Sequence, residues 1–84
     1  MKATVYVRLK EEVLDPQGDA VKRALTTLGF PGVSRVRVGK LIEIELEPAQ
    51  GESQGDIEAR LRKMADEMLA NTVIEDYEVR LLGD

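Results

Sequence analysis

The segment at residues 13–28 constrains the fold more than any other, because it predicts where a first strand gives way to a first helix. The carboxylate of Asp15 can accept hydrogen bonds from the free N–H groups of a first helical turn, and Pro16 stands where a missing N–H costs nothing. Gly29 supplies a residue type that closes many helices in the left-handed conformation. Between them one apolar stripe recurs at helical spacing: Ala20, Val21, Ala24, Leu25 and Leu28. The segment therefore predicts a helix with one face to bury.

Size and charge narrow the classes of protein to which the chain can belong. Its 84 residues suffice for a single domain, residues 1–84, and only 4% of them are aromatic, so the core must be aliphatic and modest. Such a core gives limited stability, which favours assembly with a partner. The net charge of −4 argues against binding of nucleic acid or of an anionic membrane, because both reward a basic surface. No apolar run approaches the roughly 20 residues that span a bilayer, and the first residues read as a strand rather than a signal peptide, so we expect a cytoplasmic protein.

The residue inventory argues against a stand-alone enzyme. The sequence contains neither cysteine nor histidine, so it has no thiolate nucleophile, no Cys-type metal site and no imidazole base. Neither of the glycine-rich patterns that cradle phosphates occurs in it. We expect no catalytic, cofactor-binding or metal-binding residue in this chain.

Four stretches of alternating residues predict strands. Residues 3–10 alternate in polarity, residues 33–46 read as a hairpin with its turn at Gly39–Lys40, and residues 75–82 alternate again. A strict two-residue turn would place the hairpin's valines on the glutamate face. A three-residue loop or a bulge beside Gly39 pairs Val38 with Ile42 and Val36 with Ile44, and this is the predicted register.

A second helix is predicted after the loop at residues 48–55. Ser53 followed by Asp56 is typical of a capping arrangement. The predicted core stripe of this helix includes two methionines as core filler: Ile57, Leu61, Met64, Ala65, Met68 and Leu69. We expect Asn71 to end the helix in a left-handed conformation.

The order strand, helix, strand, strand, helix, strand predicts an α+β, ferredoxin-like βαββαβ sandwich. Its four-stranded antiparallel sheet would have strand order 4-1-3-2 and both helices on one face. The second and fourth strands would be free edges, and the opposite face would be either a solvated, self-neutralising surface or a self-association surface. That face is expected to carry Thr4, Tyr6, Arg8, Arg35, Arg37, Leu41, Glu43, Glu45, Glu78 and Arg80.

Three segments resemble one known family. They read L-D-P-Q-G at residues 14–18, V-R-V-G-K at residues 36–40 and L-A-N-T-V-I-E-D-Y at residues 69–77. Together they are similar to PurS, the small subunit of phosphoribosylformylglycinamidine synthase (FGAM synthase), and the resemblance extends over essentially the whole chain. No single one of these segments is specific, but their combination is.

The resemblance implies a non-catalytic subunit of an ATP- and glutamine-dependent ligase complex (EC 6.3.5.3), which acts at the fourth step of de novo purine (IMP) synthesis. In such a complex a glutaminase subunit (PurQ) releases ammonia and a synthetase subunit (PurL) uses it, and PurS is needed for their assembly and for ammonia transfer between them. The implied homo-oligomer is a dimer or a dimer of dimers. ATP and Mg²⁺ would lie on the synthetase subunit, with no cofactor on this chain.

The three segments also supply the candidate site, a hypothetical partner interface made of Asp15, Gln17, Gly18, Arg37, Lys40, Asn71 and Thr72. Structural interpretations stand beside this one: Asp15 as a helix start, and Asn71 and Thr72 as caps. Gly18 in a first helical turn costs up to about 1 kcal/mol relative to alanine, which suggests the close approach of another backbone, such as a partner's. Arg37 and Lys40 are suited to an acidic surface of the synthetase.

Two alternatives of other classes share the predicted fold. An ACT-like domain that senses a small ligand would use a glycine in the first strand–helix loop, and Gly18 is a lone candidate. A small acyl-phosphate hydrolase would need a glycine-rich anion loop with an arginine after the first strand, which this sequence lacks.

Overall fold

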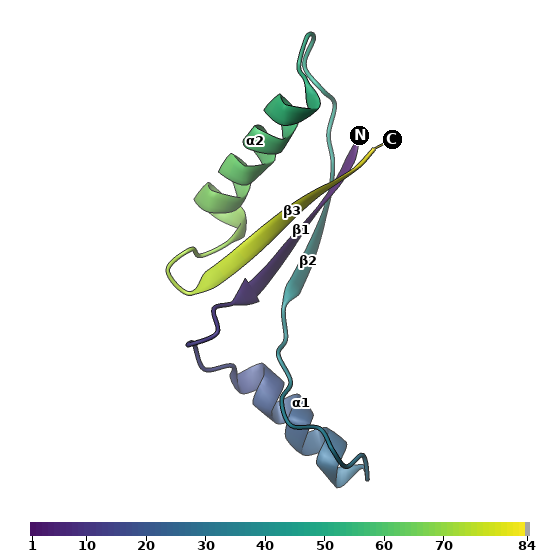
Figure 1. The fold of residues 1–84 in the computed structure, drawn as a ribbon, viewed down its shortest axis with the longest axis vertical. Coiled ribbons are helices and arrows are strands. Elements are labelled where there is room, and N and C mark those ends of the chain that lie inside the picture. The colour runs from purple at the N-terminus through teal and green to yellow at the C-terminus, as the bar shows by residue number, and fades with distance from the viewer. Residues whose placement is uncertain (84) are drawn as a thin grey trace.

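The computed structural model describes residues 1–83, which form a thin, elongated molecule of 54 × 27 × 15 Å. The elements follow the order β1 (Lys2–Leu9), α1 (Pro16–Thr27), β2 (Lys40–Glu45), α2 (Gln54–Met64), the π-helical turn η1 (Ala65–Leu69) and β3 (Glu75–Gly83). The three strands make one antiparallel sheet in the order β2-β1-β3. Helix α2 lies along one face of this sheet, whereas α1 projects beyond its end (Figure 1).

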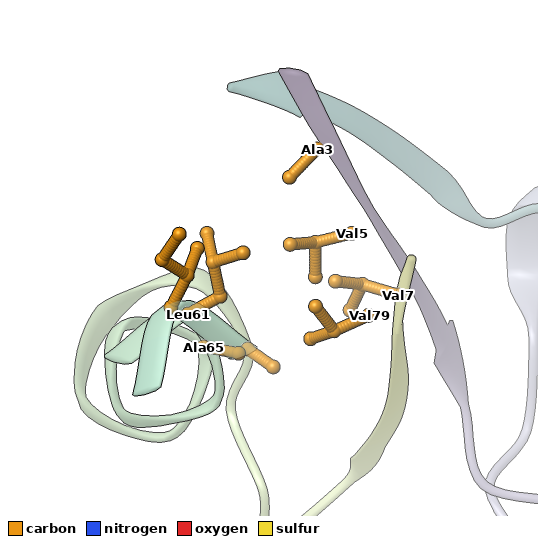
Figure 2. Packing of buried hydrophobic residues seen from close by; sticks show 8 residues of the cluster. Ala3, Val5, Val7, Leu61, Ala65 and Val79 are labelled. Carbon is orange, nitrogen blue, oxygen red and sulfur yellow. The ribbon is translucent and has the colours of Figure 1, made fainter. Parts of the chain in front are cut away.

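The core lies between the central strand and α2. Alternate residues of β1 point to the helix and are buried, namely Ala3, Val5 and Val7. They meet Leu61 and Ala65 from the helical side, as Figure 2 shows. Burial of one Val or Leu side chain contributes about 1.5–3 kcal/mol, so this small cluster accounts for most of the packing energy of the sheet and α2.

Helix α2 starts as predicted and ends differently. The Ser53 hydroxyl accepts a hydrogen bond from the Asp56 amide (3.1 Å), and the Asp56 carboxylate accepts one from the Ser53 amide (3.2 Å), which completes a capping box. At the other end, Ala70 N donates to Ala65 O (2.9 Å) and closes the π-helical turn.

The π-helical turn overturns two predictions. Met68 lies within this wider turn, which carries its side chain away from the sheet, so that Met68 is 86% exposed instead of filling the core. The helix then ends at Ala70, which is extended (φ −126°, ψ 142°). Asn71 does not adopt the predicted left-handed conformation: among the described residues, positive φ values occur only at glycines.

Helix α1 has the predicted ends. It begins after Asp15 and closes in a Schellman motif, in which Phe30 N donates to Leu25 O (3.0 Å) and Gly29 N donates to Thr26 O (3.1 Å), with Gly29 at φ 91°. Its apolar stripe, however, stays largely exposed, because α1 makes at most marginal contact with the other described helices and strands. Leu28 and Phe30 are 72% and 56% exposed.

The predicted hairpin does not form, which corrects the predicted fold. Residues 33–39 belong to no strand and run beside α1, and β2 begins only at Lys40 (Figure 1). The α+β class is right, but the four-stranded sheet of order 4-1-3-2 with two helices on one face is wrong. Within the chain, Ile42 and Ile44 lie opposite Val5 and Ala3 of β1, so the predicted pairing with Val38 and Val36 is also wrong.

Contacts with the β1–α1 connection account for this outcome. The Val38 amide donates to the Asp15 carboxylate (2.8 Å), and the Arg37 guanidinium donates to the carbonyls of Leu9 (2.8 Å) and Lys10 (2.9 Å). Gly39 lies so close to β1 that an added Cβ would come within 2.8 Å of the Val7 carbonyl oxygen. The chain is therefore held straight through the position at which the hairpin turn was predicted.

Candidate functional site

The three sequence motifs meet at one end of the sheet, where β1 ends and β2 and β3 begin (Figure 1). We call residues 15–18, 36–40 and 71–75 at this end the motif junction. Six of the seven predicted site residues make backbone or side-chain contacts there or line its hollows; Thr72 is an exposed residue of the same loop.

Asp15 is the central hydrogen-bond acceptor of the motif junction. One carboxylate oxygen accepts from Gly18 N (2.9 Å) at the start of α1, and the other accepts from Val38 N (2.8 Å) in the segment before β2. These two amide donors, more than any nearby charge, hold the pKa of the Asp15 carboxyl below its ordinary value. A single side chain thus caps the helix and joins two motifs that lie 23 positions apart in sequence.

Gly18 is required by a contact within the chain. A Cβ atom at this position would lie 2.0 Å from the carbonyl oxygen of Val36, so no other residue fits without displacement of the backbone. The sequence predicted a close backbone approach at Gly18, and the approaching backbone is the chain's own. The same contact leaves no space at Gly18 for the ligand of an ACT-like sensor.

Arg37 closes the carboxyl end of β1. Its guanidinium donates to the carbonyls of Leu9 (2.8 Å), Lys10 (2.9 Å) and Glu11 (3.4 Å). The neighbouring Arg35 instead pairs with the Glu11 carboxylate (2.8 Å), and this hydrogen bond is the main reason that the pKa of Glu11 lies below its ordinary value. Because the acceptors of Arg37 are neutral carbonyls, its positive charge stays uncompensated by them.

The third motif is tied to the second through Glu75. The Glu75 carboxylate accepts from Asn71 N (2.7 Å) and lies 3.9 Å from the Lys40 ammonium. The Asn71 side chain accepts from Val73 N (3.2 Å), so Asn71 shapes this loop through an Asx turn. Gln17 is exposed and lines a small hollow together with Lys40 and Glu75.

Beside the junction, on the sheet face away from α2, lies a shallow concavity of about 370 Å³. We call it the basic-aromatic surface; it is lined mainly by Tyr6, Arg8, Arg37, Lys40 and Leu41. Among the described residues, no carboxylate lies within 4 Å of the Arg8 guanidinium. The surface is therefore locally positive on an acidic protein. Sequence reasoning placed Tyr6, Arg8 and Leu41 on this face but did not join them to the motifs, because their proximity depends on the straight path at Gly39.

Neither a metal-binding group nor a membrane span appears in the part of the chain that the structure describes. In residues 1–83, no three His, Cys, Asp or Glu side chains are placed to hold a metal ion together. No helix in the same range combines the length and the apolar character needed to cross a bilayer.

Comparison with known proteins agrees with the motif pattern. The sequence matches the family described as PurS: Phosphoribosylformylglycinamidine (FGAM) synthase over residues 2–83. It is 47% identical over 76 residues to the FGAM synthase subunit PurS of Bacillus subtilis, and the aligned region covers 90% of this chain and 86% of that protein. It is 41% identical over 80 residues to the corresponding subunit of Methanocaldococcus jannaschii, and the aligned region covers 95% of this chain and 93% of that subunit.

Solved structures give the same answer at the level of the fold. A crystal structure of B. subtilis PurS superposes with a TM-score of 0.80 at 46% identity over 94% of both chains. A chain of the PurLQS structure from Thermotoga maritima superposes with a TM-score of 0.82 at 33% identity, over 94% of this chain and 93% of that one. Since its motifs, its fold and residues 2–83 all match in this way, the chain belongs to the PurS family of FGAM synthase subunits.

Proposed function

We propose that this chain is the small, non-catalytic subunit of an FGAM synthase complex and that it holds a glutaminase and a synthetase subunit together. The observation that carries the proposal is the match, over 94% of the chain, to a subunit of the PurLQS structure. The chemistry of the complex converts formylglycinamide ribonucleotide to formylglycinamidine ribonucleotide with ATP and glutamine-derived ammonia. The glutaminase and the synthetase supply the reacting groups, ATP and Mg²⁺ bind to the synthetase, and the complex works in the cytoplasm.

The basic-aromatic surface is the part of this chain best suited to meet the synthetase. Tyr6 and Leu41 offer apolar area with 37% and 54% exposure, and Arg8 and Lys40 add charge around them. Aromatic residues and arginine are enriched at the centres of protein interfaces, where an acidic partner patch would also gain electrostatic complementarity. In this arrangement Gln17, Arg37, Lys40 and Thr72 face the partner, while Asp15, Gly18 and Asn71 hold the motif junction in shape.

Reconstitution tests the proposal directly. The synthetase and glutaminase subunits are assayed for glutamine-dependent amidation with and without this chain, and with ammonia as the nitrogen source as a control. We expect glutamine-dependent activity to need the chain and ammonia-dependent activity to need it less. Full glutamine-dependent activity without the chain would contradict the assembly role.

A matched pair of variants locates the surface. Arg8→Glu reverses charge on the basic-aromatic surface, and Lys63→Glu makes the same change in charge on the exposed side of α2. We expect the first to weaken binding to the synthetase at least tenfold and the second to leave it unchanged, as measured by titration calorimetry. Equal losses would place the contact elsewhere on the molecule.

The chain also associates with itself in this proposal, as a dimer or a dimer of dimers. The support is physical: α1 exposes apolar side chains that an isolated subunit would leave in water.

A further inference from the structure

One turn of the chain exposes apolar side chains although its backbone is held in place. Met68 in η1 is 86% exposed, and Val73, five positions later, is 81% exposed. Five positions of extended chain span at most about 17 Å, so both side chains fit within one protein interface of ordinary width. We call residues 66–74 the exposed turn; it shares no residue with the basic-aromatic surface.

Hydrogen bonds around Asn71 fix the second half of the exposed turn. The Asn71 carbonyl accepts from Ile74 N (3.0 Å) and from Glu75 N (2.7 Å). The Asn71 side chain accepts from Val73 N (3.2 Å). The Ile74 carbonyl in turn accepts from Lys10 N (2.9 Å), which ties the turn to the end of β1. Val73 is therefore presented to solvent by an ordered backbone, and a partner that binds it has little loop ordering to offset.

The π-helical turn fixes the first half. Ala65 and Ala70, which its closing hydrogen bond joins, are both buried, whereas Met68 between them points away from the sheet. Such turns are rare and are found frequently at functional sites. Single apolar residues scattered over a surface need no explanation. Two of them, each held outwards by its own ordered backbone within a few positions, indicate a binding surface.

Charge distinguishes the exposed turn from the basic-aromatic surface. Asp66 and Glu67 directly precede Met68, and among the described residues no cation lies within 4 Å of either carboxylate. The chain around them has the same sign, because residues 41–83 contain eleven acidic and four basic side chains, whereas residues 6–40 contain four acidic and seven basic ones. The exposed turn therefore attracts a basic partner surface and repels an acidic one.

The two surfaces also belong to opposite sides of the molecule. The π-helical turn η1 continues α2, which lies along one face of the sheet, and the basic-aromatic surface lies on the other face (Figure 1). The shortest dimension of the molecule is only 15 Å. Two different subunits can therefore bind close together, one on each side, while the opposite charges of the two surfaces keep each subunit from the wrong side.

We propose that the exposed turn is the docking site of the glutaminase subunit, which meets it with an apolar pocket bordered by basic side chains. This inference rests on the proposed function, in which the synthetase occupies the basic-aromatic surface, and it adds the surface for the second partner. Met68 and Val73 enter the pocket, and the adaptable methionine side chain suits such a contact. Asp66 and Glu67 pair with the basic residues at its rim.

Cross-linking in the reconstituted complex identifies the occupant, because the natural chain contains no cysteine and a single one can be labelled. Val73→Cys and Leu41→Cys, both at exposed positions, carry the same benzophenone maleimide label before assembly. On irradiation we expect Val73→Cys to capture the glutaminase and Leu41→Cys to capture the synthetase, as read from the masses of the products. Capture of the synthetase or of a second copy by Val73→Cys, or no capture by it in an assembled complex, overturns the proposal.

Titration measures the contribution of individual side chains. Glutaminase is added to a fixed mixture of the synthetase and the chain, and glutamine-dependent amidation gives the half-maximal glutaminase concentration. We expect Met68→Asp to raise this concentration at least tenfold and Met68→Leu, which keeps the apolar volume, to leave it unchanged. Glu67→Lys should raise it at least threefold, whereas Glu47→Lys, before the other end of α2, should not.

Failure of this inference is distinguishable from failure of the proposed function. Full amidation without the chain removes the proposed function, and the docking site with it. Amidation that needs the chain but is insensitive to Met68→Asp and Glu67→Lys overturns the docking site alone. Circular dichroism checks that the variants fold, as expected for the exposed Met68. If Met68→Asp unfolds the chain, the label at Val73→Cys still decides the question.

Discussion

The two helices of this molecule have nearly equal length and opposite surroundings. Helix α2 buries Ile57 and Leu61 against the sheet, whereas α1 leaves Val21, in its own apolar stripe, 41% exposed. Both helices start with a side-chain cap. The difference teaches that an amphipathic stripe predicts a helix and a need for cover, but not whether the cover comes from the same chain.

The largest expected effect comes from the covered helix. Leu61→Ala removes a fully buried side chain and should cost about 2–5 kcal/mol of unfolding free energy, because it leaves a cavity in a small core. Thermal unfolding should therefore begin at least about 10 °C lower, whatever the protein concentration. The matched Leu28→Ala variant on α1 should show a loss of unfolding free energy whose size depends on the protein concentration. Equal, concentration-independent losses would mean that α1 is covered within its own chain.

The next effect concerns the attachment of α1 to the segment that precedes β2. Gly18→Val would drive a side chain into the Val36 carbonyl, so we expect loss of α1 helicity by circular dichroism and a Tm lower by roughly 5–10 °C. Gly51→Val is a matched control, since nothing lies within 4 Å of the added Cβ and only its positive φ (79°) opposes it. A Gly18→Val chain that folds normally and loses only partner binding would instead place Gly18 at the partner interface.

Acid should loosen the same attachment. The folded-state pKa of Asp15 lies below its ordinary value of 3.8, so its contribution to stability is present above that value and is lost as the pH falls through the lower folded pKa. Asp15→Asn should be less stable than the natural chain at pH 7, and the two Tm values should converge as the pH falls from 4 to 2. If the two curves of Tm against pH ran parallel, the ionised Asp15 carboxylate would contribute nothing to the stability of the fold.

The smallest effect tests the end of the covered helix. Met68 is 86% exposed, so Met68→Ser should change the unfolding free energy by less than about 0.5 kcal/mol. Met64 packs in part against the core, so Met64→Ser should lower the unfolding free energy by about 1 kcal/mol or more. Similar losses at both positions would indicate that the helix continues without the π-helical turn.

These contrasts also show which features of the fold the sequence could predict. The ends of α1 and the start of α2 are set by residues within five positions of one another, such as Asp15 with Gly18 and Ser53 with Asp56, and those predictions are confirmed. The hairpin prediction is wrong because Gly39 suits both a turn and a straight path. The contacts that decide between them come from Asp15 and from the carbonyls at the end of β1, more than 20 positions away.

The site was predictable to a similar degree. The motifs drew attention to Asp15, Gly18, Arg37 and Asn71, and the structure gathers them at one end of the sheet, with hydrogen bonds or packing inside the chain. A structural role for Asp15 was anticipated. The contributions of Glu75 and Arg8 were not, because each depends on which strands become neighbours. Whether the seven residues form a partner interface stays a prediction.

The guanidinium of Arg37 has a consequence for the dimensions of the molecule. By donating to the carbonyls of Leu9 and Lys10, it takes the one acceptor of the two that could face an extended β2, because successive carbonyls of a strand point to opposite edges. The ladder between these strands consequently stops at Val7 and Lys40. Arg37 thus limits the length of the sheet, and the length of the sheet in turn sets the distance between α1 and the far end of the subunit.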